Sequence, residues 1–382
     1  MIYLNHAATS WPKPPSVVAA MTTALQQPPP SAYRSTGGGS DALADKLRQR
    51  LGHLLGIAHT ERIFLSSGAT DSLNRLLQGL HLDDKPIFVT ATEHNSVLRP
   101  LMNHPKRKEH THIIPCDSHG KVSLSVIEAA LAKNEVGQEG LLVVNHCSNV
   151  TGQIQDIEGI CHLAHQYGMM VLVDVSQSAG AVTIDCDGWG CDALVFTGHK
   201  ALLGPQGIGG YYLRADIPLT PLLYGGTGRD SNRITYEDGD YEYEVGTPNA
   251  PGIAGLLAGV EEILKEGVNS ISQRLKALAQ HLIKELETIP GVTIHSPGGE
   301  EQGAVVSFNI DGIAPSDAGY ILANAYDIIL RSGLHCCPLI HPHIGSEHQG
   351  TLRASFSTTT TIGEIEALID AVKELAGTKI KR

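Results

Sequence analysis

The chain has 382 residues, 42% of them hydrophobic and 18% charged, which is typical of a soluble globular protein with one large domain or two unequal ones. Its 28 basic and 40 acidic residues give a net charge of −12, which argues against nucleic acid as a partner. No apolar run approaches the ~20 residues that a membrane-spanning helix needs, which argues against a membrane protein.

Short apolar runs alternate with amphipathic helical stretches from Arg62 onward. Runs that are apolar throughout and separated by helices are typical of a parallel sheet that is buried on both faces. We expect its strands at residues 62–67, 86–91, 141–145, 170–174, 193–197 and 209–213.

After the last of these runs, a long helical region is predicted from Gly252 to Ile289, with Pro251 near its start. Beyond it we expect strands at 304–310, 328–331 and 351–356 and helices at 316–325 and 362–375. This mixture is typical of a smaller α+β domain. We therefore predict an α/β fold with a mainly parallel central sheet in a large domain (21–255), a small C-terminal domain (256–382) and an N-terminal segment (1–20) packing on the small domain.

The sequence contains seven scattered cysteines and no Cys-x-x-Cys pair. Its first residues are polar and Pro-rich and lack the charged and then apolar pattern of a secretory signal peptide. We therefore expect reduced thiols and a cytoplasmic location.

Chemically useful side chains follow the predicted strands where each strand ends. In open parallel sheets, ligands bind beyond the carboxyl ends of the strands, so these side chains together indicate one pocket. They are Ala69 and Thr70, His94, Asn149, Asp174 and Gln177, and Thr197, His199 and Lys200.

The Gly68-Ala69-Thr70 turn is predicted to begin a helix, whose free N–H groups and positive dipole end suit a phosphate. An ordinary strand-to-helix turn is the alternative. Asp174 closes an apolar strand, and a carboxylate there needs a partner. A pyridinium N–H is such a partner and would keep an aromatic ring electron-poor; a helix cap or a structural ion pair is the alternative.

Lys200 lies in the Gly-punctuated apolar stretch 197–205, unlike a solvated surface lysine. Burial lowers the pKa of a lysine and favours the neutral amine that imine chemistry needs, although a lysine reaching to the surface stays possible. His94 suits stacking on a ring or moving a proton, and a purely structural histidine is its alternative.

With these residues the chain resembles the class V aminotransferase group of fold-type I pyridoxal-phosphate (PLP) enzymes. Within that group it is most similar to the group II (Suf-like) cysteine desulfurase/selenocysteine lyase family. The matching stretches span nearly the whole chain: 7–9, 68–70, 93–95, 148–150, 174–177, 197–200, 246–249, 331–333, 335–336 and Arg353.

The resemblance implies a role for each matching residue. Lys200 would form the Schiff base with PLP, Asp174 would pair with the ring nitrogen, and His94 would stack on the ring and take part in proton transfer. At the oxygen side of the ring the resemblance implies Gln177 and Asn149, and at the phosphate it implies Ala69, Thr70, Thr197 and His199, with Thr247 reaching the phosphate of a neighbouring subunit. The substrate would be bound by Arg353, Arg331 and Asn149. Cys336 would be the nucleophile.

The implied activity is conversion of L-cysteine to L-alanine with a persulfide left on Cys336. Only a thiolate is competent, so His335 and Arg331 are candidates for nearby positive charge. The resemblance further implies a homodimer with shared active sites, a possible sulfur-acceptor protein, and a role in sulfur transfer and iron–sulfur cluster assembly.

Two segments depart from the family pattern. The usual start Asp-Asn-Ala-Ala-Thr is replaced by Asn5-His6-Ala7-Ala8-Thr9, and an Arg-Gly-x-His type loop is replaced by Tyr33–Gly39, without the histidine. Both lie where substrate-side residues are expected, so they bear on the choice of substrate. Cys337 directly follows Cys336 and is interpreted as a small apolar neighbour or as a second thiol that relays or resolves sulfur.

Other functions stay open at this point. A PLP-dependent selenocysteine lyase, another C–S lyase, an epimerase or an aminotransferase would share fold and cofactor. His335, Cys336, Cys337, His341, His343 and His348 are dense in metal-ligand types, so a zinc or iron module is a further alternative, although their spacing fits no standard finger. A non-catalytic scaffold is disfavoured, because it need not keep Lys200, Asp174, His94 and Arg353 together.

Overall fold

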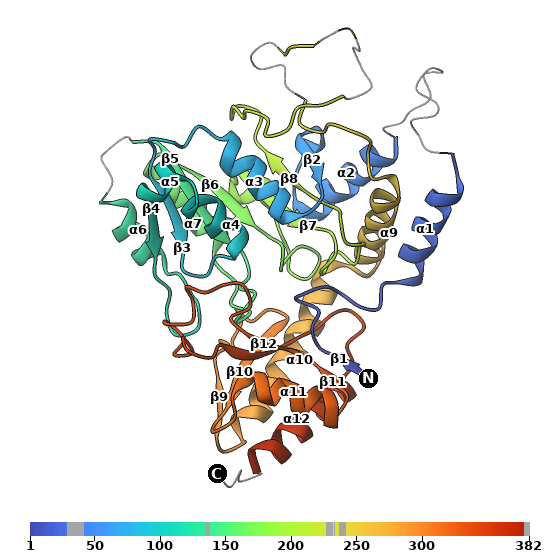
Figure 1. The fold of residues 1–382 in the computed structure, drawn as a ribbon, viewed down its shortest axis with the longest axis vertical. Helices are drawn as coiled ribbons and strands as arrows, with labels where there is room; N and C mark the ends of the chain where they lie inside the picture. The colour runs from blue at the N-terminus through green and yellow to red at the C-terminus, as the bar shows by residue number, and fades with distance from the viewer. Residues whose placement is uncertain (29–41, 134–137, 227–231, 233, 237–241, 378–382) are drawn as a thin grey trace.

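The large sheet is the central feature of the computed structural model, which describes residues 1–28, 42–133, 138–226, 232, 234–236 and 242–377 (Figure 1). Its strands lie in the order β2-β8-β7-β6-β5-β3-β4. Their bounds are β2 Ile63–Ser66, β3 Ile87–Thr90, β4 Thr111–Ile114, β5 Gly140–Asn145, β6 Met169–Asp174, β7 Ala193–Thr197 and β8 Gly209–Leu213. The six predicted strands are confirmed within one residue at each end.

The sheet is mixed rather than wholly parallel. Strands β4, β3, β5, β6 and β7 run parallel, whereas β8 is antiparallel to both β7 and β2. A run that is apolar on both faces indicates burial but carries no information on strand direction. Strand β4 was not predicted, because this edge strand exposes His112 and Ile113 and has no apolar pattern.

Alternate residues of the central strands enter two hydrophobic cores, one on each face of the sheet. On β5, Leu141 and Val143 belong to one core, and Leu142 and Val144 to the other. Burial on both faces therefore explains why these strands are apolar throughout. The first core includes α3 (Ala69–Gly79) and α4 (Asn95–Met102); the second includes α2 (Ala42–Leu55), α7 (Ile157–Gln166) and α9 (Ala250–Glu266).

The predicted helical region 252–289 is two helices, α9 and α10 (Val268–Glu287). They are separated by Gly267, whose φ of 88° lies in the left-handed region that glycine adopts without strain. The other helices are α1 (Pro15–Gln26), α5 (Pro105–Glu109), α6 (Leu124–Leu131), α8 (Cys186–Trp189), α11 (Pro315–Ala325) and α12 (Ile362–Gly377), with a 3₁₀ turn at Thr60–Arg62.

A second, antiparallel sheet lies below the large one in Figure 1, in the order β12-β13-β10-β9. Its strands are β9 (Val292–Ile294), β10 (Val305–Ile310), β12 (Arg331–Gly333) and β13 (Thr351–Ser355). The single strand predicted at 328–331 is wrong: β11 (Ile328–Ile329) and β12 belong to different sheets.

The N-terminal residues lie against this smaller sheet. Strand β1 (Ile2–Tyr3) pairs in parallel with β11, and Asn5 forms a bridge with Ser355 at the end of β13. The predicted boundary at 255/256 falls inside helix α9, and the division into domains stays a prediction. Within the described ranges, no helix is both long and apolar enough to traverse a bilayer.

Candidate active site

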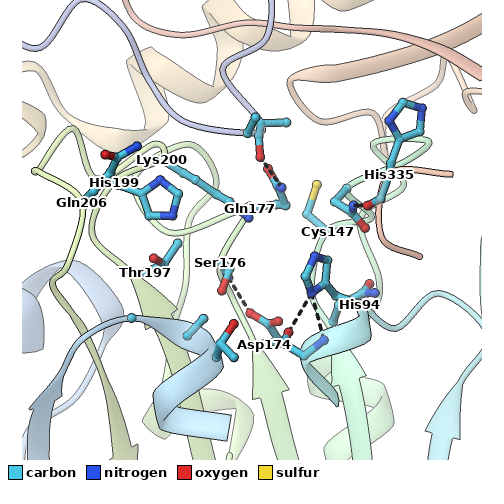
Figure 2. A pocket seen from close by; sticks show the side chains of 18 of the residues that line it. His94, Cys147, Asp174, Ser176, Gln177, Thr197, His199, Lys200, Gln206 and His335 are labelled. Atoms are coloured by element: carbon cyan, nitrogen blue, oxygen red, sulfur yellow. Dashed lines mark hydrogen bonds between the residues drawn. The ribbon is translucent and has the colours of Figure 1, made fainter. Parts of the chain in front are cut away.

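A pocket of about 480 Å³ lies beyond the carboxyl ends of the parallel strands and is closed on its other side by the small sheet (Figure 2). We call it the inner pocket. It brings together most of the predicted site residues: Ala69, Thr70, His94, Asn149, Asp174, Gln177, Thr197, His199, Lys200, Arg331 and Arg353. Cys336 and Thr247 do not line it.

One end of the inner pocket is suited to an anion. Helix α3 begins there, after Gly68, and no side chain caps its first turn. Helix N-termini with free N–H groups attract phosphate. The buried Thr197 side chain and His199, whose Nδ1 has no hydrogen-bond partner among the described residues, line the same pocket. Burial and the nearby Lys200 lower the pKa of His199 to about 4, so this ring is neutral near pH 7.

Asp174 stands at the end of β6, under the middle of the pocket, and is only 6% exposed. Its Oδ1 accepts a hydrogen bond from the Ser176 N–H at 2.8 Å. No Lys, Arg or His of the described part forms a salt bridge with it, so a buried carboxylate faces the pocket in need of a cationic partner. Ser176 Oγ is buried in the same wall without any partner among the described residues.

Figure 2 shows the Lys200 side chain extending from its loop into the pocket, towards Gln177. Burial lowers the pKa of Lys200 to about 8; Asp174 acts in the opposite direction, and Arg353 adds to the decrease. A neutral, nucleophilic amine is therefore accessible near neutral pH. Gln177 Nε2 donates to the Ala7 carbonyl oxygen at 3.0 Å, which ties the N-terminal segment to this wall.

His94 follows β3 and caps helix α4, where its Nδ1 accepts the Ser96 N–H at 3.1 Å. This contact fixes the orientation of the ring against the pocket. Burial and the charge of Lys200 lower the pKa of His94 to about 4. A neutral ring held in one orientation suits stacking on an aromatic ligand.

Arg353 reaches the pocket from strand β13 of the small sheet and is 1% exposed. It donates to the Asn149 carbonyl oxygen at 2.9 Å through Nη1 and to Asn5 Oδ1 at 3.2 Å through Nη2, while its Nε has no partner among the described residues. Burial and the charge of Arg331 lower the pKa of Arg353 to about 9, so it remains a cation at neutral pH. Both of these hydrogen-bond partners are neutral, which leaves the positive charge of the guanidinium available to bind a carboxylate.

Cys336 lies on a strained loop at the edge of the site. His335 and Cys336 have φ values of 50° and 59°, a conformation that costs free energy for residues other than glycine. Hydrogen bonds hold the loop in place: Asn149 Nδ2 donates to the His335 carbonyl at 2.7 Å, and the Asn95 N–H donates to the Cys336 carbonyl at 2.8 Å. Cys337 Sγ, fully buried, donates to the Thr92 carbonyl at 3.1 Å.

Arg331 lies beside the Cys336 thiol as expected, with Nη2 at 3.4 Å from Sγ. The corresponding expectation for His335 is wrong. Burial, with the charges of Arg353 and Arg331, lowers the pKa of His335 to about 2, so this ring is neutral. Cys336 itself faces a second hollow of about 500 Å³, the outer pocket, which adjoins the inner one at Thr70, His94 and Ser96.

Thr247 is exposed and lies apart from the inner pocket of its own chain. Its predicted contact with a neighbouring subunit stays a prediction. Of the two departures from the family pattern, Asn5 contacts Arg353 directly, whereas the segment Tyr33–Gly39 lies outside the described residues.

Some residues that line the pocket were not predicted from the sequence, among them Asn145, Ser176 and Gln206. Asn145 ends the apolar run of β5 and lies directly opposite Asp174 in the sheet, a signal that the sequence did contain. Gln206 lies in the loop between β7 and β8, and no local sequence pattern predicts that this loop lines the pocket.

The metal-site alternative has no geometric support. Among the described residues, no three His, Cys, Asp or Glu side chains are placed to hold a metal ion. The histidines of this region have other partners: His335 Nε2 lies 2.9 Å from Thr351 Oγ1, and His341 Nδ1 lies 2.7 Å from Ser346 Oγ.

Comparison with known proteins agrees with this geometry. The model of the family "Aminotransferase class-V" matches residues 2–368. A probable cysteine desulfurase of Methanothermobacter thermautotrophicus is 31% identical, over 98% of this chain and 95% of the relative; one of Pyrococcus abyssi is 30% identical, over 98% and 94%.

The solved structures that superpose on this chain also include cysteine desulfurases. An apo cysteine desulfurase from Thermococcus onnurineus superposes with a TM-score of 0.87 at 30% identity, covering 98% of this chain and 94% of that one. The cysteine desulfurase CsdA of Escherichia coli gives a TM-score of 0.84 at 27% identity, covering 97% and 94%. The predicted fold class is therefore confirmed.

Proposed function

The chain belongs to the class-V aminotransferase family, and on this premise we propose that it is a PLP-dependent cysteine desulfurase. One observation carries the proposal: a cysteine thiol, Cys336, lies beside Arg331 at the border of a pocket that also holds Lys200, Asp174 and Arg353. An amine, a ring-nitrogen partner, a carboxylate clamp and a thiol are the groups that removal of sulfur from cysteine requires.

The residues present fit PLP. The uncapped start of α3, with Thr70, Thr197 and His199, would hold the phosphate. Asp174 would pair with the ring nitrogen, and His94 would lie against the ring. The partnerless Ser176 Oγ and His199 Nδ1 are the unsatisfied buried polar atoms that a polar ligand would satisfy.

When bound, PLP supplies an aldehyde carbon that reacts with amines and an aromatic ring that accepts electrons from the Cα–H bond of an amino acid. Lys200 would hold the cofactor through Nζ and, once displaced by substrate, carry the Cα proton on the same atom, which its lowered pKa of about 8 permits. Asp174 would pair with the N–H of the ring nitrogen and so favour its protonated form. Arg353 would bind the substrate carboxylate and Asn149 would line the substrate side.

Cys336 would take the sulfur atom of the bound cysteine. Its thiolate would attack the substrate sulfur, so that an S–S bond forms as the C–S bond breaks. The electron pair of the broken bond stays with the substrate carbon, which takes up a proton to give alanine, and Cys336 is left as a persulfide. The guanidinium of Arg331, with Nη2 at 3.4 Å from Sγ, would place a positive charge beside the attacking sulfur. Cys336 lines the outer pocket, while its Sγ lies 3.4 Å from Nη2 of Arg331, which lines the inner one, so the thiol lies at the border of the two.

The proposal includes a homodimer, in which the exposed Thr247 of one subunit reaches the phosphate end of the other. Transfer of the persulfide sulfur to an acceptor, in the service of iron–sulfur cluster assembly, is part of the same proposal. All seven cysteines are free thiols, which supports a reducing compartment such as the cytoplasm.

The decisive experiment incubates the PLP-loaded protein with L-cysteine, measures alanine and maps any persulfide by mass spectrometry of thiol-blocked peptides. We expect equal amounts of alanine and of sulfur bound to Cys336 in a single turnover. Cys336→Ser should bind PLP normally and form no persulfide, and Lys200→Ala should lose the visible absorbance of the enzyme-bound cofactor. Lys85→Ala, which removes a surface lysine paired with Glu139, is the matched control.

Other products would contradict the proposal. Pyruvate and ammonia would indicate β-elimination, and conversion of L-selenocysteine without any reaction of L-cysteine would indicate a selenocysteine lyase. A protein that develops no absorbance with PLP would contradict the cofactor assignment itself.

A further inference from the structure

The Cys336 thiol stands between two hollows of similar size. The inner pocket, about 480 Å³, is lined by Lys200 and Arg353; the outer pocket, about 500 Å³, is lined by Cys336 and by helices α3 and α4. The two adjoin, because Thr70, His94 and Ser96 line both. A thiol that takes sulfur from a substrate on one side and passes it on needs access to both. Lys200 and Asp174 line only the inner pocket, whereas the predicted cofactor residues Thr70 and His94 lie at the border of the two.

The charge of the outer pocket is distinctive. The chain carries 40 acidic against 28 basic residues, yet no acidic residue lines this pocket. Arg99, on α4, does line it; the side chain is exposed and forms no hydrogen bond or ion pair with any other described residue. Its charge lies close enough to His94 to contribute to lowering the pKa of that ring. A positively charged side chain that is not paired with a carboxylate, in a pocket that no acidic residue lines, favours an anionic ligand.

The size and surface of the outer pocket fit a small molecule. Its volume lies within the range of roughly 300–1,000 Å³ that is typical of small-molecule sites. Amide side chains also line it: Asn74, Gln78, Asn95 and Asn103. Asn74 and Asn103 each donate one N–H to a backbone carbonyl oxygen of their own helix, and Gln78 Oε1 accepts from Arg107, so further N–H groups remain for a ligand. These groups suit the peptide bonds and carboxylates of a short acidic thiol compound.

We propose that the outer pocket is an acceptor subsite that binds a small anionic thiol, pairs its carboxylate with Arg99 and directs its sulfur to the persulfide on Cys336. This inference rests on the proposed desulfurase function. The acceptor thiolate attacks the outer sulfur of the persulfide, a new S–S bond forms, and the bond between the two persulfide sulfurs breaks. The electron pair returns to Cys336 Sγ as thiolate, and the acceptor leaves as a persulfide, so no external oxidant or reductant is needed.

Sulfur transfer is tested with thiols of different charge. The PLP-loaded enzyme is first converted to the Cys336 persulfide with one equivalent of L-cysteine. Loss of the persulfide is then timed with N-acetyl-L-cysteine (anionic), 2-mercaptoethanol (neutral) and thiocholine (cationic), none of which carries an amine that reacts with PLP. Comparing each variant with the wild type for the same thiol removes the intrinsic reactivity of the thiol.

Arg99→Glu should slow transfer to N-acetyl-L-cysteine at least tenfold, leave 2-mercaptoethanol within about twofold, and accelerate thiocholine. Formation of the persulfide should stay within about twofold, because Arg99 does not line the inner pocket. Arg50→Glu is the matched control: Arg50 is also an exposed helix arginine, on α2, and its change alters net charge equally.

A second measurement does not depend on desulfurase activity. Iodoacetate and iodoacetamide alkylate thiols and are of similar size, but only iodoacetate is charged. Arg99→Glu should lower the ratio of the iodoacetate rate to the iodoacetamide rate at Cys336 at least fivefold, whereas Arg50→Glu should leave this ratio unchanged.

Equal slowing of all three thiols by Arg99→Glu, or an unchanged alkylation ratio at Cys336, would overturn the acceptor subsite. A wild-type enzyme that forms no persulfide would instead refute the proposed function, and the alkylation ratio would still decide whether the outer pocket selects anions.

Discussion

The two walls of the site are held in place by different means. On the large-sheet side, Asp174 and Thr197 end buried parallel strands, so their positions follow from the sheet itself. On the small-sheet side, strand register fixes only the backbone of Arg353 on β13, and its guanidinium and the Cys336 loop are placed by hydrogen bonds to segments far away in the sequence. We therefore expect the first wall to be the more rigid and the second to be the more adjustable.

The largest effect on the adjustable wall is expected at Arg353. Arg353→Lys keeps the positive charge but removes the planar fork that binds a carboxylate through two bonds. Truncating one partner of a buried charged hydrogen bond costs about 2–5 kcal/mol, so we expect KM for L-cysteine to rise about 100-fold with a smaller change in kcat. Steady-state alanine formation measures both constants.

Cysteamine separates binding of the carboxylate from general damage to the site, because it is cysteine without the carboxylate. The PLP-loaded wild type should bind L-cysteine much more tightly than cysteamine, as judged by the change in cofactor absorbance, and Arg353→Lys should nearly abolish the difference. If both ligands weaken equally, Arg353 acts through the loop structure and not by binding the carboxylate.

Lys200 belongs to the rigid wall, because it lies in the loop that follows β7. This wall is tested by the pH dependence of the rate at which Lys200 reacts with added PLP. Only a neutral amine adds to an aldehyde, and the pKa of Lys200 is lowered by burial to about 8. Below this pKa the neutral fraction rises tenfold per pH unit. The rate at which PLP-free protein takes up PLP should therefore rise tenfold from pH 6 to 7 and level off above about pH 8.

Nα-acetyl-lysine serves as the reference for that measurement, since the unperturbed lysine pKa is about 10.4 and its reaction with PLP keeps accelerating up to that pH. A capture rate that follows the reference beyond pH 9 would show that the Lys200 pocket does not perturb the amine.

A smaller effect is expected for Cys337, which anchors the loop through Sγ and the Thr92 carbonyl. Removing a hydrogen bond of this kind costs about 1 kcal/mol, or about fivefold in the population of the anchored loop. Cys337→Ala should raise the alkylation rate of Cys336 and lower kcat by a few-fold, whereas Cys337→Ser, which retains a donor, should lie closer to the wild type.

Cys161→Ala removes another fully buried thiol, away from the site, and is the control for loss of packing. If the Cys337→Ala variant equals this control in every readout, the anchoring role is wrong. A persulfide found on Cys337 of the wild type would instead support the relay interpretation.

The last prediction concerns stability rather than activity, at Glu93, which is fully buried beneath the rigid wall. Its Oε1 accepts hydrogen bonds from Thr90 Oγ1 at 2.6 Å and from the Asn145 N–H at 2.9 Å, and its Oε2 has no partner among the described residues. Burial raises the pKa of Glu93 to about 8, so the folded protein holds a proton that the unfolded chain loses near pH 4.5.

Between these two pH values the folded state binds more protons than the unfolded one, so stability falls as pH rises. The full effect is about 1.4 kcal/mol per pH unit, or about 2 °C in Tm for a chain of this length. Glu93→Gln, which cannot ionise, should flatten the decrease of Tm between pH 5 and pH 7.5. Parallel Tm curves for the two proteins would show that Glu93 is ionised in the folded state.

The residues at the strand ends show how much of the site could be predicted from the sequence. The apolar runs predicted the strands, and the rule that ligands bind beyond parallel strand ends placed Asp174, Thr197 and Lys200 in one pocket. The same runs could not give the direction of β8, because burial on both faces looks alike in either direction. Arg331 and Arg353 entered the prediction only through the resemblance, since their proximity to the pocket depends on how the small sheet lies against the large one.

By itself, the sequence determined the elements and the chemical groups: a buried sheet, a lysine in an apolar loop, a carboxylate at a strand end and a late pair of cysteines. Only the tertiary structure decided which groups meet. It buried His335 as a neutral ring, placed the Cys337 thiol against the Thr92 carbonyl oxygen, and put Cys336 in the lining of the outer pocket. The physical reason is that hydrophobic periodicity is local, whereas burial, charge and hydrogen bonding at this site join residues nearly 350 positions apart, as between Asn5 and Arg353.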